Sequence, residues 1–209
     1  MKKLYILLLS LITTASFSQA TDLFFSQYGE GSGNNKFLEI YNGTGQDVGL
    51  SNYAFPSVAN DPDVLGMHEY WNNFPEGAVV ANGDVYVIAH PNASDEIKAT
   101  ADHEHTYLSN GDDGYALVLG TEEQYSIVDF IGDFGDDPGA GWDVAGVVEA
   151  TKNHTLTRKS TVCQGNPDWD VSRGTNDEDS EWIVTEQNDI TGLGSHVAEC
   201  SSDLSVLIT

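Results

Sequence analysis

Hydrophobic and polar positions alternate along the chain in short stretches that turn signals separate. Near the start, apolar-rich stretches cover Leu23–Tyr28 (LFFSQY), Lys36–Tyr41 (KFLEIY) and Val48–Phe55 (VGLSNYAF). A glycine-rich connector joins the first two, and the Asn-Gly pair after the second is a strong tight-turn signal. This pattern predicts three successive antiparallel strands.

Glu39 is the one acidic residue within the second of these strands. Successive side chains of a strand point to opposite faces, so Glu39 shares its face with Phe37 and Tyr41. A carboxylate on an inward face needs hydrogen-bond donors, because an unpaired buried charge costs several kcal/mol. We therefore expect Glu39 to be a structural carboxylate that accepts backbone N–H bonds from a neighbouring loop.

The rest of the chain continues as short strands between polar loops. Pro56–Gly77 is rich in Pro, Asn and Asp and reads as a long loop with one short strand at His68–Trp71. Ser94–Ala101 is the single predicted helix, with Ser94 as its N-cap. Further strands are predicted at Val85–His90, Gly114–Gly120, Tyr125–Gly132, Asn153–Ser160 and Ser180–Glu186. Many short strands, dense turns and one small helix predict an all-β sandwich.

The first twenty residues have the features of a secretory signal peptide. Lys2 and Lys3 precede an apolar run, and small residues precede a cleavage site near Ala20. The apolar run is too short for a lasting membrane span, and no later stretch reaches that length. We expect residues 1–20 to be removed and the mature chain to be secreted or held at the cell surface.

The strong negative charge of the chain limits the classes of partner that it can bind. The formal net charge is −25, and removal of the signal peptide takes away two of the eight basic residues and none of the 33 acidic ones. Such a charge repels nucleic-acid backbones and anionic lipids, so no nucleic-acid partner is expected. It suits a salty medium, a cationic partner or bound calcium.

Cys163 and Cys200 are the two cysteines of the chain. In an exported protein an even count favours a disulfide, and closing a loop of this length stabilises the fold by about 3–4 kcal/mol. We expect this bridge to fix the C-terminal segment to the domain. Residues 201–209 are a tail or the start of a further module.

Several of these segments together resemble a lamin tail domain. The matching residues are Phe24–Tyr28 (FFSQY), Phe37–Asn42 (FLEIYN) and Leu50–Phe55 (LSNYAF), and the similarity continues to about Gly132 through NGDVYVIAH, GDDGYALVLG and YSIVDFIGDFG. The resemblance implies an immunoglobulin-like β-sandwich that binds or tethers and has no active site. The chain lacks the coiled coil and basic face of nuclear lamins, which removes the inference of DNA binding.

The resemblance also implies the domain boundaries. A lamin-tail-like domain spans residues 21–200, with a core of about 22–135 and a loop-rich β extension over 136–200. That extension is similar to one in exported bacterial relatives, where such modules accompany secreted nucleases, phosphatases or surface proteins.

Metal sites are the first candidate chemistry. His103 and His105 would share one face of an extended segment and could hold zinc with His68 and His90, although a solvated polar loop is the favoured interpretation of the pair. Acidic loops could supply oxygens to calcium, but none has EF-hand spacing. These loops are Gly111–Asp113, Gly132–Asp137 and Asn176–Glu181. No other cofactor is expected.

Catalytic motifs and aromatic residues are the remaining candidates. The sequence lacks a GxSxG elbow, HExxH, a P-loop, a dinucleotide fingerprint and CxxC. Among the tryptophans, Trp71, Trp142 and Trp182 are expected in the core, whereas Trp169, flanked by two aspartates, is expected to face solvent. The Arg158-Lys159 pair is interpreted as a strand end that offsets acidic neighbours.

The sequence therefore favours a secreted, non-catalytic module that binds a protein or polysaccharide partner through its loops. The alternative is a small extracellular hydrolase that uses clustered carboxylates with calcium. A third hypothesis is a calcium-stabilised adhesive protein. A deep cleft with converging carboxylates would favour the enzyme, and exposed aromatic residues would favour binding.

Overall fold

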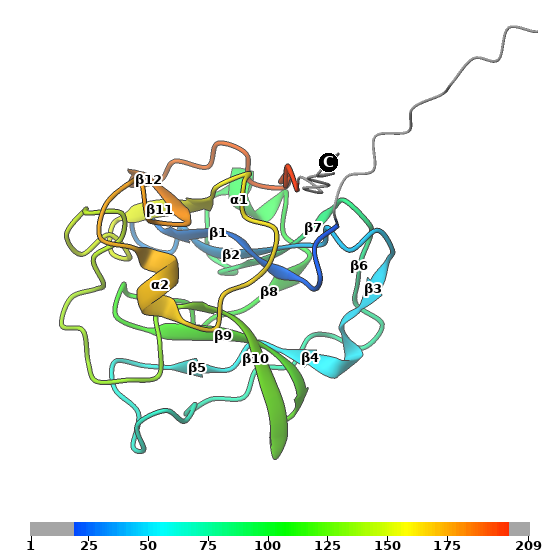
Figure 1. The fold of residues 1–209 in the computed structure, drawn as a ribbon, viewed down its shortest axis with the longest axis horizontal. Coiled ribbons are helices and arrows are strands. Elements are labelled where there is room, and N and C mark those ends of the chain that lie inside the picture. The colour runs from blue at the N-terminus through cyan, green and yellow to red at the C-terminus, as the bar shows by residue number, and fades with distance from the viewer. Residues whose placement is uncertain (1–18, 201–209) are drawn as a thin grey trace, which may run out of the picture.

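The computed structural model describes residues 19–200, which form an all-β fold with two short α-helices (Figure 1). The predicted signal peptide, apart from its last two residues, and the predicted tail at 201–209 lie outside the described residues. No helix within 19–200 is long and apolar enough to cross a membrane.

The larger layer is a six-stranded sheet with the order β12-β11-β1-β2-β7-β8. Its strands are β1 (Phe24–Glu30), β2 (Lys36–Tyr41), β7 (Val85–Ala89), β8 (His103–Glu104), β11 (His154–Arg158) and β12 (Trp182–Glu186). All neighbours are antiparallel except β7 and β8, which run parallel. The segments predicted at Asn153–Ser160 and Ser180–Glu186 thus extend the sheet beyond β1.

The second layer is built on the hairpin of β9 (Gly114–Thr121) and β10 (Gln124–Ile131), with β4 (Tyr53–Ala54) and β5 (Ser57–Val58) also paired to β9. A separate pair joins β3 (Val48–Gly49) to β6 (Val79–Val80). Apolar side chains from both layers meet in one core, which makes the molecule a β-sandwich.

The predicted meander of three strands is wrong in its third member. β1 and β2 form the expected antiparallel pair, but the chain then leaves the sheet and β4 pairs with β9 in the other layer. Asn42 explains the departure, because its side-chain oxygen accepts from Thr44 N and its amide donates to the Gln46 and Val80 carbonyls. These bonds hold a wide loop in place of a two-residue hairpin turn.

One predicted strand is also wrong. His68–Trp71 forms no strand; it contributes an isolated bridge at Tyr70 to Ser57. Three residues after Tyr70, Asn73 makes a similar bridge to Ala54. The backbone here follows the edge of β4 and β5 as a loop that these isolated bridges hold in place.

The two α-helices have side-chain caps. In α1 (Asp95–Lys98) the predicted cap Ser94 accepts from Ile97 N at 3.4 Å. The sequence pattern did not indicate α2 (Trp169–Arg173), which Asp168 caps by accepting from Val171 N at 3.2 Å. A helix this short carries too little periodic signal to be distinguished from a loop.

Trp169 is 2% exposed, so the expectation of a solvent-facing ring is wrong. Helix α2 places the ring edge-on to Trp142 and Trp182, at centroid distances of 6.4 and 6.3 Å. Burial of a large aromatic surface outweighs the polar character of its two aspartate neighbours, which stay exposed at the helix surface. The core placement of Trp142 and Trp182 is as expected, and Trp71 is half-buried against the core.

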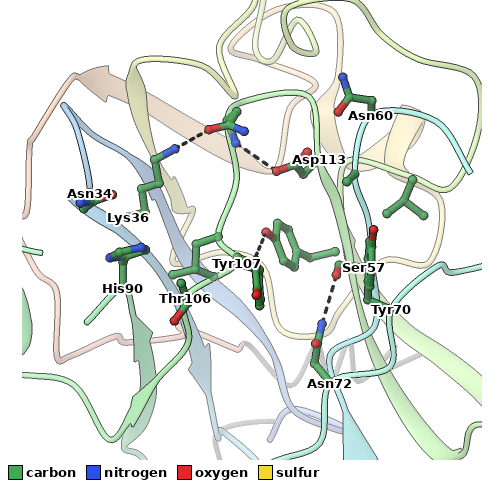
Figure 2. Close-up of a pocket in the computed structure, with 15 residues that line it drawn as sticks. Asn34, Lys36, Ser57, Asn60, Tyr70, Asn72, His90, Thr106, Tyr107 and Asp113 are labelled. Atoms are coloured by element: carbon green, nitrogen blue, oxygen red, sulfur yellow. Dashed lines mark hydrogen bonds between the residues drawn. The ribbon is translucent and has the colours of Figure 1, made fainter. Parts of the chain in front are cut away.

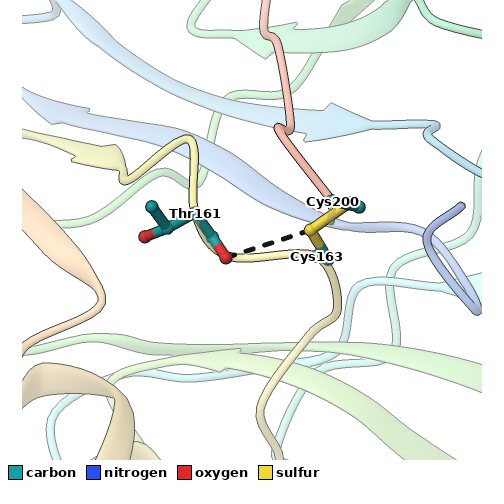
Figure 3. Close-up of a disulfide and its surroundings, with 3 residues drawn as sticks. All are labelled: Thr161, Cys163 and Cys200. Atoms are coloured by element: carbon teal, nitrogen blue, oxygen red, sulfur yellow. Dashed lines mark hydrogen bonds between the residues drawn. A yellow bond between two sulfur atoms is a disulfide. The ribbon is translucent and has the colours of Figure 1, made fainter. Parts of the chain in front are cut away.

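The outer face of the six-stranded sheet is covered by α1 and by the C-terminal segment 190–200. Ile190 and Leu193 pack on a small cluster around Phe37, and Ala198 packs on Phe24 and Tyr41. The disulfide between Cys163 and Cys200 joins the end of this segment to the loop after β11 (Figure 3).

Glu39 lies on this covered face and is 1% exposed. Its carboxylate accepts from the Ser26 hydroxyl and from the Gly194 backbone N–H, each at 2.7 Å. The prediction of a carboxylate held by loop backbone is confirmed. Burial raises the pKa of Glu39 to about 7, although both hydrogen bonds act in the opposite direction.

The raised pKa of Glu39 predicts a specific pH dependence of stability. The folded pKa lies above the ordinary value of 4.5, so the folded protein binds the extra proton. The contribution of Glu39 is therefore complete below pH 4.5 and is lost as the pH rises through about 7. The free energy of unfolding, measured with urea, should fall between pH 5 and pH 8 by ~2 kcal/mol less in Glu39→Gln than in the wild type.

The comparison of the wild type with Glu39→Gln also controls for the titration of His196, which packs against Phe24 and Tyr41 on the same face. Burial lowers the pKa of His196 to about 4, so its contribution is present above pH 6.5 and is lost as the pH falls toward 4. This opposite trend is common to both proteins and cancels in the difference. Equal pH dependence in the two would contradict the role given to Glu39.

Candidate functional site

The most strongly ionic group of residues is buried and serves the fold. Arg158 is 1% exposed and pairs with Asp129 and Glu181, while its Nε donates to the Phe25 carbonyl at 3.0 Å. The guanidinium carbon lies 3.9 Å from the centroid of the Trp182 ring. Arg158 does offset acidic neighbours, as interpreted from the sequence, but it does so inside the sandwich.

Asp129 completes this centre. Its carboxylate accepts from Arg158 and from the backbone N–H groups of Phe25, Phe130 and Asn166. Both carboxylate oxygens are therefore paired and fully enclosed. The arrangement holds β1, β10 and β11 together and offers no access to a ligand.

The histidines considered for zinc do not converge with other ligands. The rings of His103 and His105 lie 6.3 Å apart, both edge-on to Phe55, and burial lowers the pKa of each. His68 lies apart from them, against Trp71 and Tyr125. Within residues 19–200 no three His, Cys, Asp or Glu side chains gather as a metal site would require.

The three acidic loops differ in how far their carboxylates are already hydrogen-bonded within the protein. In the Asn176–Glu181 loop, the Asp179 carboxylate accepts hydrogen bonds from the N–H and hydroxyl of Thr175 and from the N–H of Asn176. In the Gly132–Asp137 loop, Asp133 accepts from the Gly135 N–H. In the Gly111–Asp113 loop, one carboxylate oxygen of each aspartate is buried without a partner among the described residues. Burial also raises the pKa of Asp113.

A hollow with a volume of about 700 Å³ opens next to the Gly111–Asp113 loop (Figure 2). It lies where the two layers meet, between Lys36 at the start of β2, His90 after β7, Ser57 in β5 and Tyr115 in β9. The loop that joins β8 to β9 forms a further wall. We call this the polar hollow, because side-chain amides, hydroxyls and tyrosines make up much of its lining.

Lys36 is the one cation in the wall of the polar hollow, and its ammonium already has partners within the protein. Its ammonium donates to the Ser109 carbonyl and to Asn110 Oδ1 at 2.9 Å, and it lies 3.3 Å from Glu30 Oε1. An ammonium has three donors, so these partners satisfy it. It fixes the β8–β9 loop to β2 and leaves no free positive charge for an anion.

Two tyrosines stand at the opening of the polar hollow with their backbones fixed. Tyr107 is 81% exposed, and its carbonyl accepts from the Tyr115 hydroxyl at 3.1 Å. Tyr70 is 55% exposed, and its backbone exchanges hydrogen bonds with Ser57 at 2.9 and 3.0 Å. Figure 2 shows both side chains at the edge of the same hollow. The sequence pattern drew attention to the tryptophans, and it carries no signal that distinguishes these two tyrosines from the others.

Polar groups of the wall remain available to a ligand. Asn72 uses its amide protons on the Phe55 carbonyl and Ser57 Oγ, which leaves its oxygen as an acceptor. Asn110 uses its oxygen on Lys36, which leaves its amide protons as donors. His90 Nδ1 accepts from Asn92 N at 3.0 Å, so a neutral ring carries its proton on Nε2.

The comparisons with known proteins identify the fold family. The family model described as Lamin Tail Domain matches residues 16–134, which is more than half of the chain. No curated protein and no solved structure matches the chain. The matched region includes β1 to β10 and the walls of the polar hollow, within an immunoglobulin-like β-sandwich. The chain belongs to the lamin tail domain family.

Proposed function

We propose that this protein is a secreted, non-catalytic module that binds or tethers a partner on the cell surface or in the extracellular space. The family supports a binding role, since lamin tail domains are immunoglobulin-like and non-catalytic. The polar hollow is the binding surface, because loops on a rigid scaffold carry recognition. Export rests on the signal-peptide features of residues 1–20 and accords with the disulfide.

The observation that carries the proposal is the lining of the polar hollow. Two exposed tyrosines flank it, and Asp113 is the one carboxylate among its lining residues. A glycosidase needs two carboxyl groups on either side of the scissile bond. Ser57 Oγ accepts from Asn72, and His90 Nδ1 accepts from the backbone, so neither is arranged as a nucleophile with its base. These contacts favour binding over the hydrolase alternative.

The first test concerns export. The full chain, produced in a bacterial expression host, should appear outside the cytoplasm with its N-terminus at Thr21. N-terminal sequencing and fractionation measure both results. An uncleaved chain that stays in the cytoplasm would contradict secretion.

The second test concerns binding. The labelled mature chain is incubated with intact cells of the organism that encodes it, and the bound fraction is measured after sedimentation. We expect the wild type to bind and Tyr70→Ala/Tyr107→Ala to lose at least 10-fold in bound fraction. Val148→Ser is the matched control, because Val148 is 69% exposed and does not line the hollow. Equal binding by all three proteins would exclude the hollow as the binding surface.

A further inference from the structure

We propose that the polar hollow binds a neutral sugar chain, with the rings of Tyr107 and Tyr70 against the sugar faces and the surrounding amides and His90 bonded to the hydroxyls. This inference rests on the proposed function and names its ligand class. Four properties of the hollow support it: its charge, its exposed rings, its hydrogen-bonding groups and its size.

The charge of the hollow excludes anionic ligands. Lys36, its single ammonium, is occupied by Ser109, Asn110 and Glu30. Asp113 lies in the wall, and the chain carries a formal net charge of −25. A phosphate or an acidic polymer would meet repulsion without a compensating cation. The ligand is therefore neutral or cationic.

The two tyrosines provide flat surfaces at the opening. A tyrosine ring has an apolar face and a polar tip, which suits a ligand that has both apolar C–H surfaces and hydroxyls. The backbone bonds of Tyr107 to Tyr115 and of Tyr70 to Ser57 hold the loops in place before any ligand arrives. Fixed loops lower the entropy that binding would otherwise cost.

The hydrogen-bonding groups match hydroxyls. A sugar hydroxyl both donates and accepts, and the wall offers both functions close together. The Asn72 side-chain oxygen can accept, and the Asn110 amide can donate. His90 is 7% exposed, and its Nε2 has no protein partner among residues 19–200. A donor that lines the hollow without a protein partner can bond to a ligand oxygen.

The size and shape of the hollow fit a segment of a polymer. Its volume of about 700 Å³ lies within the range of small-molecule sites. Aromatic grooves also bind proline-rich peptides, but those depend on apolar slots for the proline rings. Val58, Ala59 and Leu108 give this hollow some apolar surface, but Asn34, Asn60 and Asn72 place amides along the same wall. The lining therefore favours a sugar over a peptide.

Calorimetric titration of the mature protein tests the inference. The probes are the hexasaccharides of β-1,4-glucose, β-1,3-glucose, β-1,4-xylose, β-1,4-mannose and N-acetylglucosamine, with polygalacturonate and a proline-rich decapeptide as comparison ligands. We expect at least one neutral hexasaccharide to bind. For that sugar, Tyr107→Ala and Tyr70→Ala should each raise Kd at least 10-fold, whereas Tyr107→Phe should stay within 3-fold. Val148→Ser should bind as the wild type does.

Thermal melts of every variant establish that the fold is intact. Three results would overturn the inference: no neutral sugar binds, the decapeptide or polygalacturonate binds in their place, or sugar binding is unchanged in Tyr107→Ala. Competition in the cell-binding assay separates the two proposals. If cells bind through the tyrosines and no sugar competes, the binding function stands and the sugar inference fails. If cells do not bind the wild-type protein at all, the proposed function itself fails.

Discussion

Replacement of Arg158 by methionine is expected to lower the free energy of unfolding by about 4 kcal/mol. Methionine fills a similar volume but removes the charge that faces Asp129, which is 0% exposed. The carboxylate would remain buried with an uncompensated negative charge. Urea unfolding followed by tryptophan fluorescence measures the loss, because Trp182 lies against the Arg158 guanidinium.

Two further variants distinguish this mechanism from a general loss of packing. In Arg158→Met/Asp129→Asn part of the stability should return, because the fully buried carboxylate no longer carries a charge, while Glu181, which also loses Arg158, is 25% exposed. Arg173→Met breaks a pair with Asp170 whose partners are both partly exposed, and should change stability by less than ~1 kcal/mol. If Arg158→Met lost no more than Arg173→Met, the buried pair would not stabilise the fold as described.

Removal of the disulfide is expected to have the second-largest effect. Cys163 and Cys200 are 37 positions apart, and opening a loop of that length costs about 3–4 kcal/mol. The double variant Cys163→Ser/Cys200→Ser should therefore unfold at a lower urea concentration than the oxidised wild type. A reducing agent should lower the stability of the wild type to the level of the variant and leave the variant unchanged.

The position of the bridge adds a local expectation. It holds the end of segment 190–200, which covers Glu39 and donates to it through Gly194. Amide hydrogen exchange of Gly194 should therefore become faster in the variant than exchange in the central strands β1 and β2. Uniformly faster exchange would mean that the bridge stabilises the whole domain without fixing this segment in particular.

The hairpins and central strands followed from the sequence because their signals are local. Alternation and turn residues identified β1, β2, β7 and the β9–β10 pair, and these segments formed strands as expected. The partner of a strand is a different matter. Whether Tyr53–Ala54 joins β2 or β9 depends on the whole sandwich, so the local turn signal after β2 gave the wrong neighbour.

Burial of polar and aromatic groups was harder to predict for a related reason. Arg158 and Trp169 both stand among charged residues in sequence, and both are buried because distant segments enclose them. The polar hollow shows the same dependence. Tyr70 and Tyr107 come from separate loops, and only the contacts of each loop with β5 and β9 bring the rings to one opening.

The pairing of β1 with β11 has a consequence for the order in which the molecule forms. Gln27 and Thr157, which face each other in the register, are separated by 130 positions. The edge of β1 that faces β11 therefore stays uncovered until this distant part of the chain has been made. Pairing over such a distance slows folding, because the closure entropy of a long loop precedes the gain from contacts. During this interval the open edge of β1 is the place where a chaperone would be most useful.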